Sequence, residues 1–301
     1  MGSVDGSIAP MVTPESAARE LRENTTDGAA VLARRAISLL SSFVAAADDD
    51  DLPAVARRCA EQMRNARPTM AAVGNLVRFW MESFSWPHDD FRRRAMAHCE
   101  AILAKADRAL AETVRIARVR LGGFPPDSVL MTHSASSTVR SVIDGLPFRL
   151  LVTASEPGGE GRRMARELGV TCVEDADAPS RVADVAAVVV GADAVGSEAF
   201  INKVGTRALA HAARQSSTPF FVVTESYKWV ASARPIVEED SFEAVENGFV
   251  AAFLGDARFV SFAATRKLEL PDDYASAWTE SDEQADRVLD RSSNDGLAAW
   301  R

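Results

Sequence analysis

The stretch VLMTHSASSTVR, Val129 to Arg140, changes from an apolar run to a cluster of small hydroxyl residues within a few positions. The apolar run is typical of a buried strand, and the segment that begins near Ser136 is typical of a helix start. A strand that leads directly into a helix is the repeating unit of a parallel α/β sheet. Ligands of such sheets bind beyond the carboxyl ends of the strands, so this stretch predicts both a fold and the location of a site.

The hydroxyl cluster consists of Ser134, Ser136, Ser137 and Thr138 and has two interpretations. Hydroxyls and free amides at a helix start suit a phosphate group. The same residues also cap a helix when no ligand is bound, and the stretch taken alone favours this simpler interpretation. His133 is a candidate base, although a single histidine at a strand end is more typical of a hydrogen-bonded structural residue.

The chain from residue 122 onward predicts a Rossmann-like domain. After the turn-rich connector GGFPPDS, the apolar runs SVLMTH, FRLLVTA, TCVEDA, VAAVVVGAD, PFFVVTES and ARFVSFAA alternate with the helical segments SSTVRSVI, GEGRRMAREL, APSRVAD and INKVGTRALAHAARQS. This alternation indicates an α/β fold whose parallel sheet is covered on both faces. We place the domain at residues 122–301, including a polar, acidic tail after Leu270 with one amphipathic helical pattern, DEQADRVLDR.

The first 121 residues predict an N-terminal helical domain. From about Ser16 to Arg120, apolar residues recur at helical spacing in segments that cover residues 27–47, 48–68, 69–84 and 91–121. Asp27 is expected to cap the first of these segments. The tetra-aspartate run at residues 48–51 is expected to be a solvated helix start, where negative charge favours the helix dipole.

Composition and charge limit the function. The 301 residues include 34 Lys and Arg against 43 Asp and Glu, a formal net charge of −9, which disfavours a direct nucleic-acid interface. No apolar run is long enough to span a bilayer, the N-terminus does not resemble a secretory signal, and the three cysteines are widely spaced. We therefore expect a cytoplasmic protein with free thiols and with no membrane partner, metal or cofactor.

The segment VVVGADAVGSEAFINKVGT carries a second polar cluster. Asp193 is expected at the carboxyl edge of a buried strand, and Asn202 and Lys203 at the start of the next helix. A lysine near a helix N-terminus is unfavourable for the helix dipole, so Lys203 suggests an anionic partner. In the simpler alternative, Asp193 caps a turn and pairs with Lys203. Convergence of these groups on the predicted ligand edge favours a binding role.

Two other strand ends also carry polar groups. Thr224-Glu225-Ser226 ends one strand, with Lys228 beyond it, and Glu160 opens a helix after a glycine-rich turn. The glycines of that turn and of the helix start could let backbone amides face a phosphate. Neither the Rossmann nor the P-loop glycine pattern is present, so the sequence specifies no nucleotide.

Six of these segments, in this order, resemble the initiation factor 2B alpha/beta/delta subunit family, which includes the methylthioribose-1-phosphate and ribose-1,5-bisphosphate isomerases. They are DGAAVLARRA, ARPTMAAVGNLVR, VLMTHSASSTV, VTASEPGGEGRRMAREL, VVVGADAVGSEAFINKVGT and PFFVVTESYKW, and they lie between about Asp27 and Trp229. The resemblance implies an N-terminal helical domain, a Rossmann-like domain, and assembly as homodimers or higher oligomers.

The resemblance also implies residue roles. In the isomerases the ligand is a ribose that carries a 1-phosphate, and protons are transferred by a cysteine after the Thr-His pair and by the aspartate of the Gly-Ala-Asp motif. The positions that match are Ser134 and Asp193 for these two groups, Arg67, Asn202 and Lys203 for residues that hold the ligand, and Glu160 for a polar position.

The chain departs from the isomerase pattern at three positions. Ser134 replaces the cysteine, and a hydroxyl cannot act as a thiolate-type acid/base near neutral pH without an activating partner. Asp27 and Glu156 stand where the isomerases usually carry arginines, and a carboxylate repels a phosphate that an arginine would bind. The hydroxyl-rich segment THSASSTV is more similar to the initiation-factor branch, whose pocket can bind a phosphosugar without converting it.

Three hypotheses follow. In the first, the chain is an initiation factor 2B subunit-like protein that binds a phosphorylated sugar or a nucleotide at the carboxyl edge of its sheet. Ser134, Ser136 and Ser137 would then supply donors, Arg67 and Lys203 positive charge, and Asp193 and Asn202 contacts to ligand hydroxyls. In the second it is an aldose–ketose isomerase of a ribose 1-phosphate derivative, with Asp193 as acid/base. In the third it is a non-catalytic oligomeric scaffold.

Overall fold

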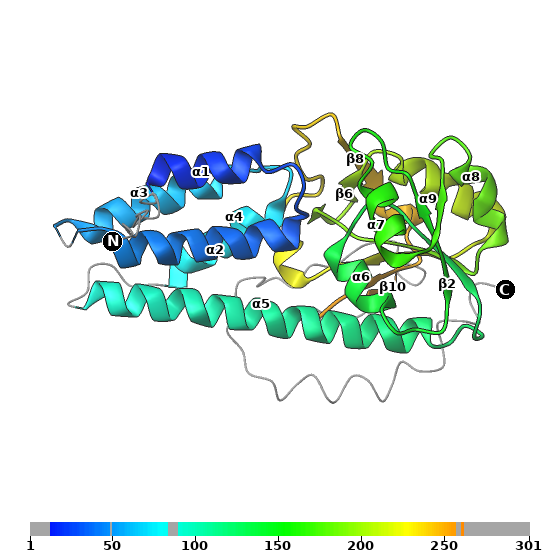
Figure 1. The fold of residues 1–301 in the computed structure, drawn as a ribbon, viewed down its shortest axis with the longest axis horizontal. Helices are drawn as coiled ribbons and strands as arrows, with labels where there is room; N and C mark the ends of the chain where they lie inside the picture. Colours follow the sequence, from blue (N-terminus) through cyan, green and yellow to red (C-terminus); the bar gives the residue numbers. More distant parts are fainter. Residues whose placement is uncertain (1–12, 49, 84–89, 257–259, 262–301) are drawn as a thin grey trace, which may run out of the picture. The chain divides into compact units, whose positions relative to one another are not determined.

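The computed structural model describes residues 13–48, 50–83, 90–256 and 260–261. It has a mixed α/β fold with a helical N-terminal region and a sheet of mostly parallel strands (Figure 1), which confirms the predicted fold class. The chain divides into two compact units, residues 1–108 and 109–301, which are described separately below. Helix α5 (Phe91–Leu121) contributes residues to both units.

The helical unit contains α1 (Pro14–Glu23), α2 (Ala29–Ala46), α3 (Leu52–Arg64), α4 (Ala71–Ser83) and the first part of α5. Helix α2 is its centre, because it packs against α1, α3 and α4. Among the described helices, α2 is the one whose length and composition would allow it to cross a membrane, but most of its apolar residues are buried within the unit. We therefore interpret α2 as the core helix of this unit.

The start of α2 differs from the prediction. Its N-cap is Gly28, which supplies no side-chain cap, and Asp27 lies one residue too early to cap the helix. The Asp27 carboxylate instead accepts a hydrogen bond of 2.8 Å from the Asn24 amide group. The Asn24 side-chain oxygen in turn accepts from the backbone amide of Asp27, at 3.0 Å, so a local asparagine turn replaces the expected cap.

The α/β unit is built on a seven-stranded sheet in the order β10-β9-β7-β4-β1-β2-β3. The parallel strands are β1 (Val129–Thr132), β2 (Arg149–Thr153), β3 (Thr171–Val173), β4 (Ala187–Val190), β7 (Phe220–Val223) and β9 (Ala252–Leu254), and β10 (Val260–Ser261) is antiparallel. Besides the last part of α5, the α-helices described in this unit are α6 (Ser137–Ile143), α7 (Glu160–Leu168), α8 (Ala178–Arg181) and α9 (Thr206–Ser216).

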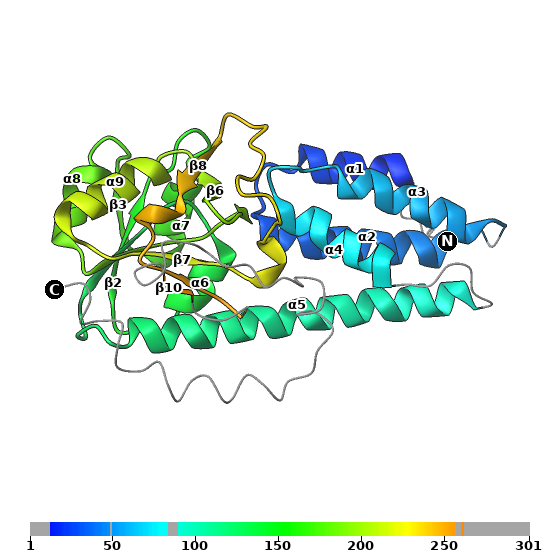
Figure 2. The same ribbon diagram turned by 180° about the vertical axis from the view of Figure 1, so that it is seen from behind.

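Helices cover both faces of this sheet, as the continuous apolar strands predict. Every residue of β4 and β7 is buried. Alternate residues face opposite sides, so that Val188 packs in a core with Leu209 of α9, and Val189 in a core with Val139 of α6. Figures 1 and 2 show these helices around the sheet from opposite directions.

Three features of this unit were not predicted from the sequence. Strand β9 extends the parallel sheet. A second, antiparallel sheet contains β5 (Ala194–Val195), β6 (Ala199–Lys203) and β8 (Phe242–Glu246). The third is that Asn202 and Lys203 end strand β6, whereas the sequence placed them at the start of a helix; α9 begins three residues later. The predicted amphipathic helix at 282–291 lies outside the described residues.

Candidate functional site

The chain changes direction across the sheet between β1 and β4. From β1 it proceeds outward through β2 to β3, and it then returns to β4 on the other side of β1. The loops that follow two such strands leave in opposite directions, which opens a crevice at the carboxyl edge. The candidate site therefore lies where the loop after β1, residues 133–136, meets the loop after β4, residues 191–193.

These two loops are in close contact. A methyl group added at Gly191 would lie only 2.6 Å from the Ser136 hydroxyl oxygen and 2.9 Å from its Cβ. Only glycine fits at this position without displacing Ser136. The Gly-Ala-Asp motif and the hydroxyl cluster, which are more than fifty residues apart in the sequence, are thus neighbours at one edge of the sheet.

His133 joins three loops at this edge. Its Nε2 donates to the Val204 carbonyl at 2.8 Å, and its Nδ1 accepts from the Thr153 hydroxyl. Burial lowers the pKa of His133 below its ordinary value, and this effect outweighs the hydrogen bond to Val204, which raises it. Gly205, at φ +104°, lies against the ring, where a Cβ would be 2.8 Å from Cε1. The imidazole is therefore neutral and structural, as the simpler interpretation expects.

Ser134 and Ser155 follow β1 and β2 in matching left-handed conformations, at φ +66° and +64°. Non-glycine residues in this region carry strain, which is often found at ligand sites. The Ser134 amide donates to the Ser155 hydroxyl at 2.7 Å, so the two loops support each other. The Ser134 side chain is half-buried, and no described residue is hydrogen-bonded to its hydroxyl.

Ser136 and Ser137 differ in their surroundings. The Ser136 hydroxyl caps α6 by accepting a 3.2 Å hydrogen bond from the Val139 amide. Ser137 is the first residue of the helix and is exposed. The capping interpretation of the cluster therefore applies to Ser136, while the hydroxyls of Ser134 and Ser137 are placed where a ligand can reach them.

Lys203 has an anionic partner within the protein. Its ammonium lies 2.7 Å from Glu160 Oε1, and the side chains of Lys203 and Glu160 are only 6% and 20% exposed. The ammonium also donates to the Pro157 carbonyl. The alternative in which Lys203 pairs with Asp193 is wrong, because its ion-pair partner is Glu160. Asn202, the preceding residue, donates to the Thr206 hydroxyl at 3.0 Å.

Two backbone amide pairs at the same edge also bind carboxylates of the protein. Asp175 accepts from the amides of Ser155 and Glu156, at 2.8 and 2.7 Å. Glu243 accepts from the amides at the start of α9, Gly205 at 2.8 Å and Arg207 at 2.9 Å. Neither carboxylate belongs to the site residues that the sequence predicts. Asp175 follows the third predicted strand and was detectable as a strand-end residue, whereas Glu243 lies on β8, which carried no recognised signal.

Asp193 and Arg67 complete the predicted set. Asp193 is largely buried just after β4, and its amide donates to the Ile201 carbonyl at 2.8 Å. Its backbone is therefore fixed between the two sheets. Arg67 belongs to the helical unit, where it is buried and donates to the Asn24 carbonyl at 2.5 Å. Its contact with a ligand, which the resemblance implies, stays a prediction.

A buried ion pair lies at the end of β7. Glu225 Oε2 is 2.8 Å from Lys228 Nζ, and the two side chains are 0% and 3% exposed. The Thr138 hydroxyl donates to the other carboxylate oxygen at 2.7 Å. Burial would raise the pKa of Glu225, but Lys228 and these hydrogen bonds outweigh it and hold the pKa below its ordinary value. Glu225 and Lys228 thus neutralise each other's charge within the protein, and the hydrogen bond from Thr138 connects α6 to this ion pair.

Asp256, at the end of β9, forms a neighbouring cluster. It accepts from the amide of Ser226 at 2.7 Å and from its hydroxyl at 2.6 Å. Burial raises the pKa of Asp256 to about 6, the bonds from Ser226 oppose this, and the nearby Glu225 adds to it. Asp256 is absent from the predicted site because the sequence does not predict the strand β9 that positions it.

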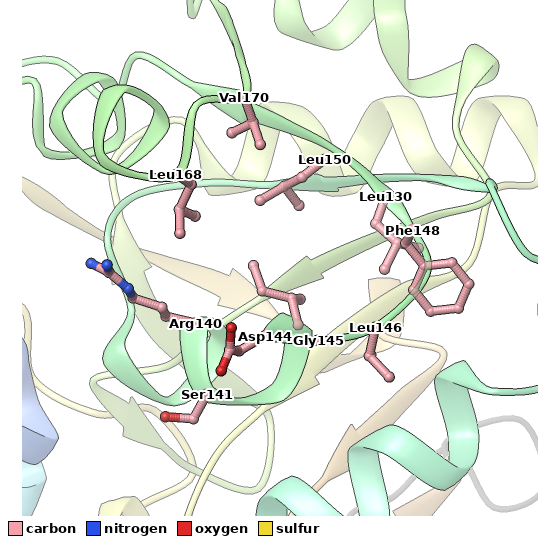
Figure 3. Close-up of a pocket in the computed structure, with 11 residues that line it drawn as sticks. Leu130, Arg140, Ser141, Asp144, Gly145, Leu146, Phe148, Leu150, Leu168 and Val170 are labelled. Atoms are coloured by element: carbon pink, nitrogen blue, oxygen red, sulfur yellow. The ribbon is translucent and has the colours of Figure 1, made fainter.

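A pocket of about 590 Å³ lies away from these residues, on the α6 side of the sheet (Figure 3). Its wall combines the polar residues Arg140, Ser141 and Asp144 with the apolar residues Leu130, Ile143, Leu146, Phe148, Leu150, Leu168 and Val170. None of the predicted site residues lines it. Within the described ranges, no group of three or more His, Cys, Asp or Glu side chains could hold a metal ion.

Comparison with known proteins gives consistent matches. The model of the initiation factor 2 subunit family matches residues 25–253. A ribose 1,5-bisphosphate isomerase of Archaeoglobus fulgidus is 30% identical over 225 residues, 71% of this chain and 71% of the relative. A putative translation initiation factor eIF-2B subunit 2-like protein of Pyrococcus horikoshii is 28% identical over 222 residues, 70% of this chain and 77% of the relative. The crystal structure of the Pyrococcus horikoshii translation initiation factor eIF-2B has a TM-score of 0.71 at 24% identity and covers 84% of this chain and 98% of that one, a likeness of fold.

Proposed function

The chain belongs to the initiation factor 2 subunit family, and from this premise we propose that it binds a phosphorylated sugar or a nucleotide in the crevice between β1 and β4, without the cysteine–aspartate chemistry of the isomerases. The observation that carries the proposal is the contact between Ser136 and Gly191, which joins the loops after these two strands. In this site Ser134 and Ser137 donate to the ligand, Asp193 and Asn202 contact its hydroxyls, and Lys203, beside its ion-pair partner Glu160, donates to it as well.

The surroundings of Ser134 favour binding over proton transfer. A serine needs an adjacent base to become an acid/base or a nucleophile near neutral pH. The nearest histidine, His133, uses both ring nitrogens in bonds to Val204 and Thr153 and has a lowered pKa. Ser134 is therefore a hydrogen-bonding residue in this proposal. We further expect a cytoplasmic protein that forms a homodimer or a higher oligomer.

Isomerisation of a ribose 1-phosphate derivative is the second candidate. Similarity to proteins named ribose 1,5-bisphosphate isomerase supports it, as does the aspartate at the family's proton-transfer position, which follows β4 and is largely buried. In this case Asp193 transfers the proton, and Ser134 or a neighbour replaces the thiol. The third candidate, a scaffold subunit with a vestigial pocket, needs no ligand.

Calorimetric and thermal-shift titration with ribose 1-phosphate, ribose 1,5-bisphosphate, methylthioribose 1-phosphate and AMP tests the proposal. A ligand at a hundredfold excess over its Kd should stabilise the protein by about 2.7 kcal/mol. The same titrations with Asp193→Asn should show weaker binding. If none of these compounds shifts the unfolding temperature, the binding proposal is wrong and the scaffold remains.

An assay for ketose formation separates binding from isomerisation. The binding proposal predicts no turnover by the wild type with any of the three ribose phosphates. Turnover that disappears in Asp193→Asn would instead support the isomerase. In Ser134→Cys, gained turnover would identify the missing thiol as the element that the site lacks.

A further inference from the structure

The anion-binding groups at the carboxyl edge are occupied by carboxylates of the protein itself. Asp175 binds the amides of Ser155 and Glu156, and Glu243 binds the amides at the start of α9. Lys203 binds Glu160. Because Asp175 and Glu243 each hold two amides of a fixed turn, they are structural. Glu160 is different, since it neutralises a side-chain cation that the proposed function uses.

The ion pair between Glu160 and Lys203 is enclosed by the loop after β2. The Pro157 carbonyl accepts from the same ammonium. Gly158, at φ +106°, passes so close that a Cβ there would lie 2.7 Å from Glu160 Oε2 and 3.7 Å from Lys203 Nζ. Glu160 Oε2 is itself buried, and no described residue is hydrogen-bonded to it. The carboxylate is thus held in place by Lys203 on one oxygen, while its other oxygen is left unpaired.

This arrangement changes the charge that a ligand meets. Lys203 alone would attract a phosphate, but the pair has no net charge, and Glu156 adds a carboxylate to the same loop, 3.6 Å from Arg162. Arg162 is in turn engaged by Glu174 through two hydrogen bonds of 2.7 and 2.8 Å. A second negative group placed beside Lys203 would face Glu160 at short range in a partly desolvated site, where repulsion is strong.

We propose that Glu160 is the specificity-determining residue of the site and restricts it to ligands that bring an uncharged group, such as a sugar hydroxyl, to Lys203. The ligand is therefore a sugar with a single phosphate, and a bisphosphate binds only if its second phosphate displaces Glu160 from Lys203. This inference rests on the proposed function, because it concerns the same site and assumes that a phosphosugar enters it.

The test compares ribose 1-phosphate with ribose 1,5-bisphosphate by calorimetry in the full-length protein. Wild type should bind the monophosphate at least as tightly as the bisphosphate. In Glu160→Gln, affinity for the bisphosphate should rise by about tenfold or more, the effect of one charge-assisted contact, with a smaller change for the monophosphate. The matched control is Glu167→Gln on the same helix, where Glu167 pairs with exposed Arg140 at 2.6 Å; it should change neither affinity.

Two further variants identify the cation and protect the test against misfolding. Glu160→Gln combined with Lys203→Gln leaves no buried charge unpaired and should lose the gain for the bisphosphate. Glu160→Asp keeps the charge but retracts the carboxylate by one methylene, and it should raise bisphosphate affinity by a smaller factor. If Glu160→Gln does not fold, the bisphosphate affinity of Glu160→Asp alone tests the specificity role of Glu160.

The outcomes separate this inference from the proposed function. If wild type binds ribose 1-phosphate but the Glu160 variants keep the wild-type preference, or bind both sugars more weakly, the specificity role is wrong and the binding function stands. An equal gain in Glu167→Gln would also overturn it, because general surface charge would then be the cause. If the wild type and all variants bind neither sugar, both proposals fail.

Discussion

Gly191→Ala perturbs a close contact between the loops after β1 and β4. Gly191 is not in the left-handed region of the backbone, so alanine is sterically compatible with its own conformation. The new methyl group would lie 2.6 Å from the Ser136 hydroxyl oxygen, 2.9 Å from its Cβ and 4.0 Å from Val139 Cγ2. Ser136 must then retreat by about 0.8 Å to reach ordinary contact. The substitution should therefore push the loop after β1 away from the loop after β4.

The expected loss in the free energy of unfolding depends on two effects, overpacking by the new methyl group and the change at the N-cap of α6. Forcing a methyl group into a packed contact costs about 1–3 kcal/mol. Ser136→Gly removes the two Ser136 atoms that the methyl group would crowd and leaves only the ordinary contact with Val139, and glycine at an N-cap costs only a few tenths of a kcal/mol relative to serine. The double variant Gly191→Ala/Ser136→Gly should therefore be more stable than Gly191→Ala alone, with a coupling energy of about 1–2 kcal/mol. Ser136→Ala should rescue only in part, because its Cβ remains.

Urea unfolding followed by circular dichroism measures the free energies of unfolding, and calorimetry with ribose 1-phosphate measures the effect on binding. Gly191→Ala should weaken binding and lower stability, and the double variant should recover both in part. A cost for Gly191→Ala below about 0.5 kcal/mol, within the usual range for neutral surface changes, would refute the close contact. Strict additivity of the two substitutions would refute it as well.

Two further predictions concern the polar clusters at the ends of β7 and β9. Lys228→Met leaves the fully buried Glu225 without its cation and should destabilise the protein by about 3–5 kcal/mol. The double variant Lys228→Met/Glu225→Gln should lose much less stability, because no unpaired charge remains buried. Equal losses of the two variants in urea unfolding would contradict this prediction. Because burial raises the pKa of Asp256 to about 6 from an ordinary 3.8, the folded state binds this proton more tightly. The resulting stability is present below about pH 4 and is lost as the pH rises through 6. Asp256→Asn should remove this pH-dependent loss of unfolding free energy, which amounts to at most about 3 kcal/mol between pH 4 and pH 7.5. If urea unfolding shows the same pH profile for the variant and the wild type, the raised pKa of Asp256 is wrong.

Much of the fold could be predicted from the sequence because its signals are local. Apolar runs such as Val188–Val190 and Phe220–Val223 are long enough to indicate buried parallel strands, and the helical spacing of the N-terminal region is clear. Strands β5 and β6 pair locally but β5 has only two residues, and β6 also pairs with β8, which lies far along the chain, so the sequence gives no clear signal for this sheet. Lys203 was assigned to a helix start for this reason.

The site was predictable as a set of strand ends but not as a network of charges. Parallel topology brings Ser136 and Gly191 together wherever β1 and β4 are neighbours. The partner of Lys203, in contrast, depends on the path of the glycine turn before Glu160, and the sequence does not determine this path. For the same reason, carboxylates on unpredicted segments, such as Glu243, were not recognised as ligands of backbone amides.

A crystal structure of the protein with bound ribose 1-phosphate tests the central claim most directly. We expect the sugar phosphate at the carboxyl edge between β1 and β4, within hydrogen-bonding distance of Ser134 and Asp193, with an uncharged hydroxyl toward Lys203. Density in the pocket between Leu130 and Leu168, or anywhere that leaves Ser134 and Asp193 without a contact to the ligand, would contradict this claim.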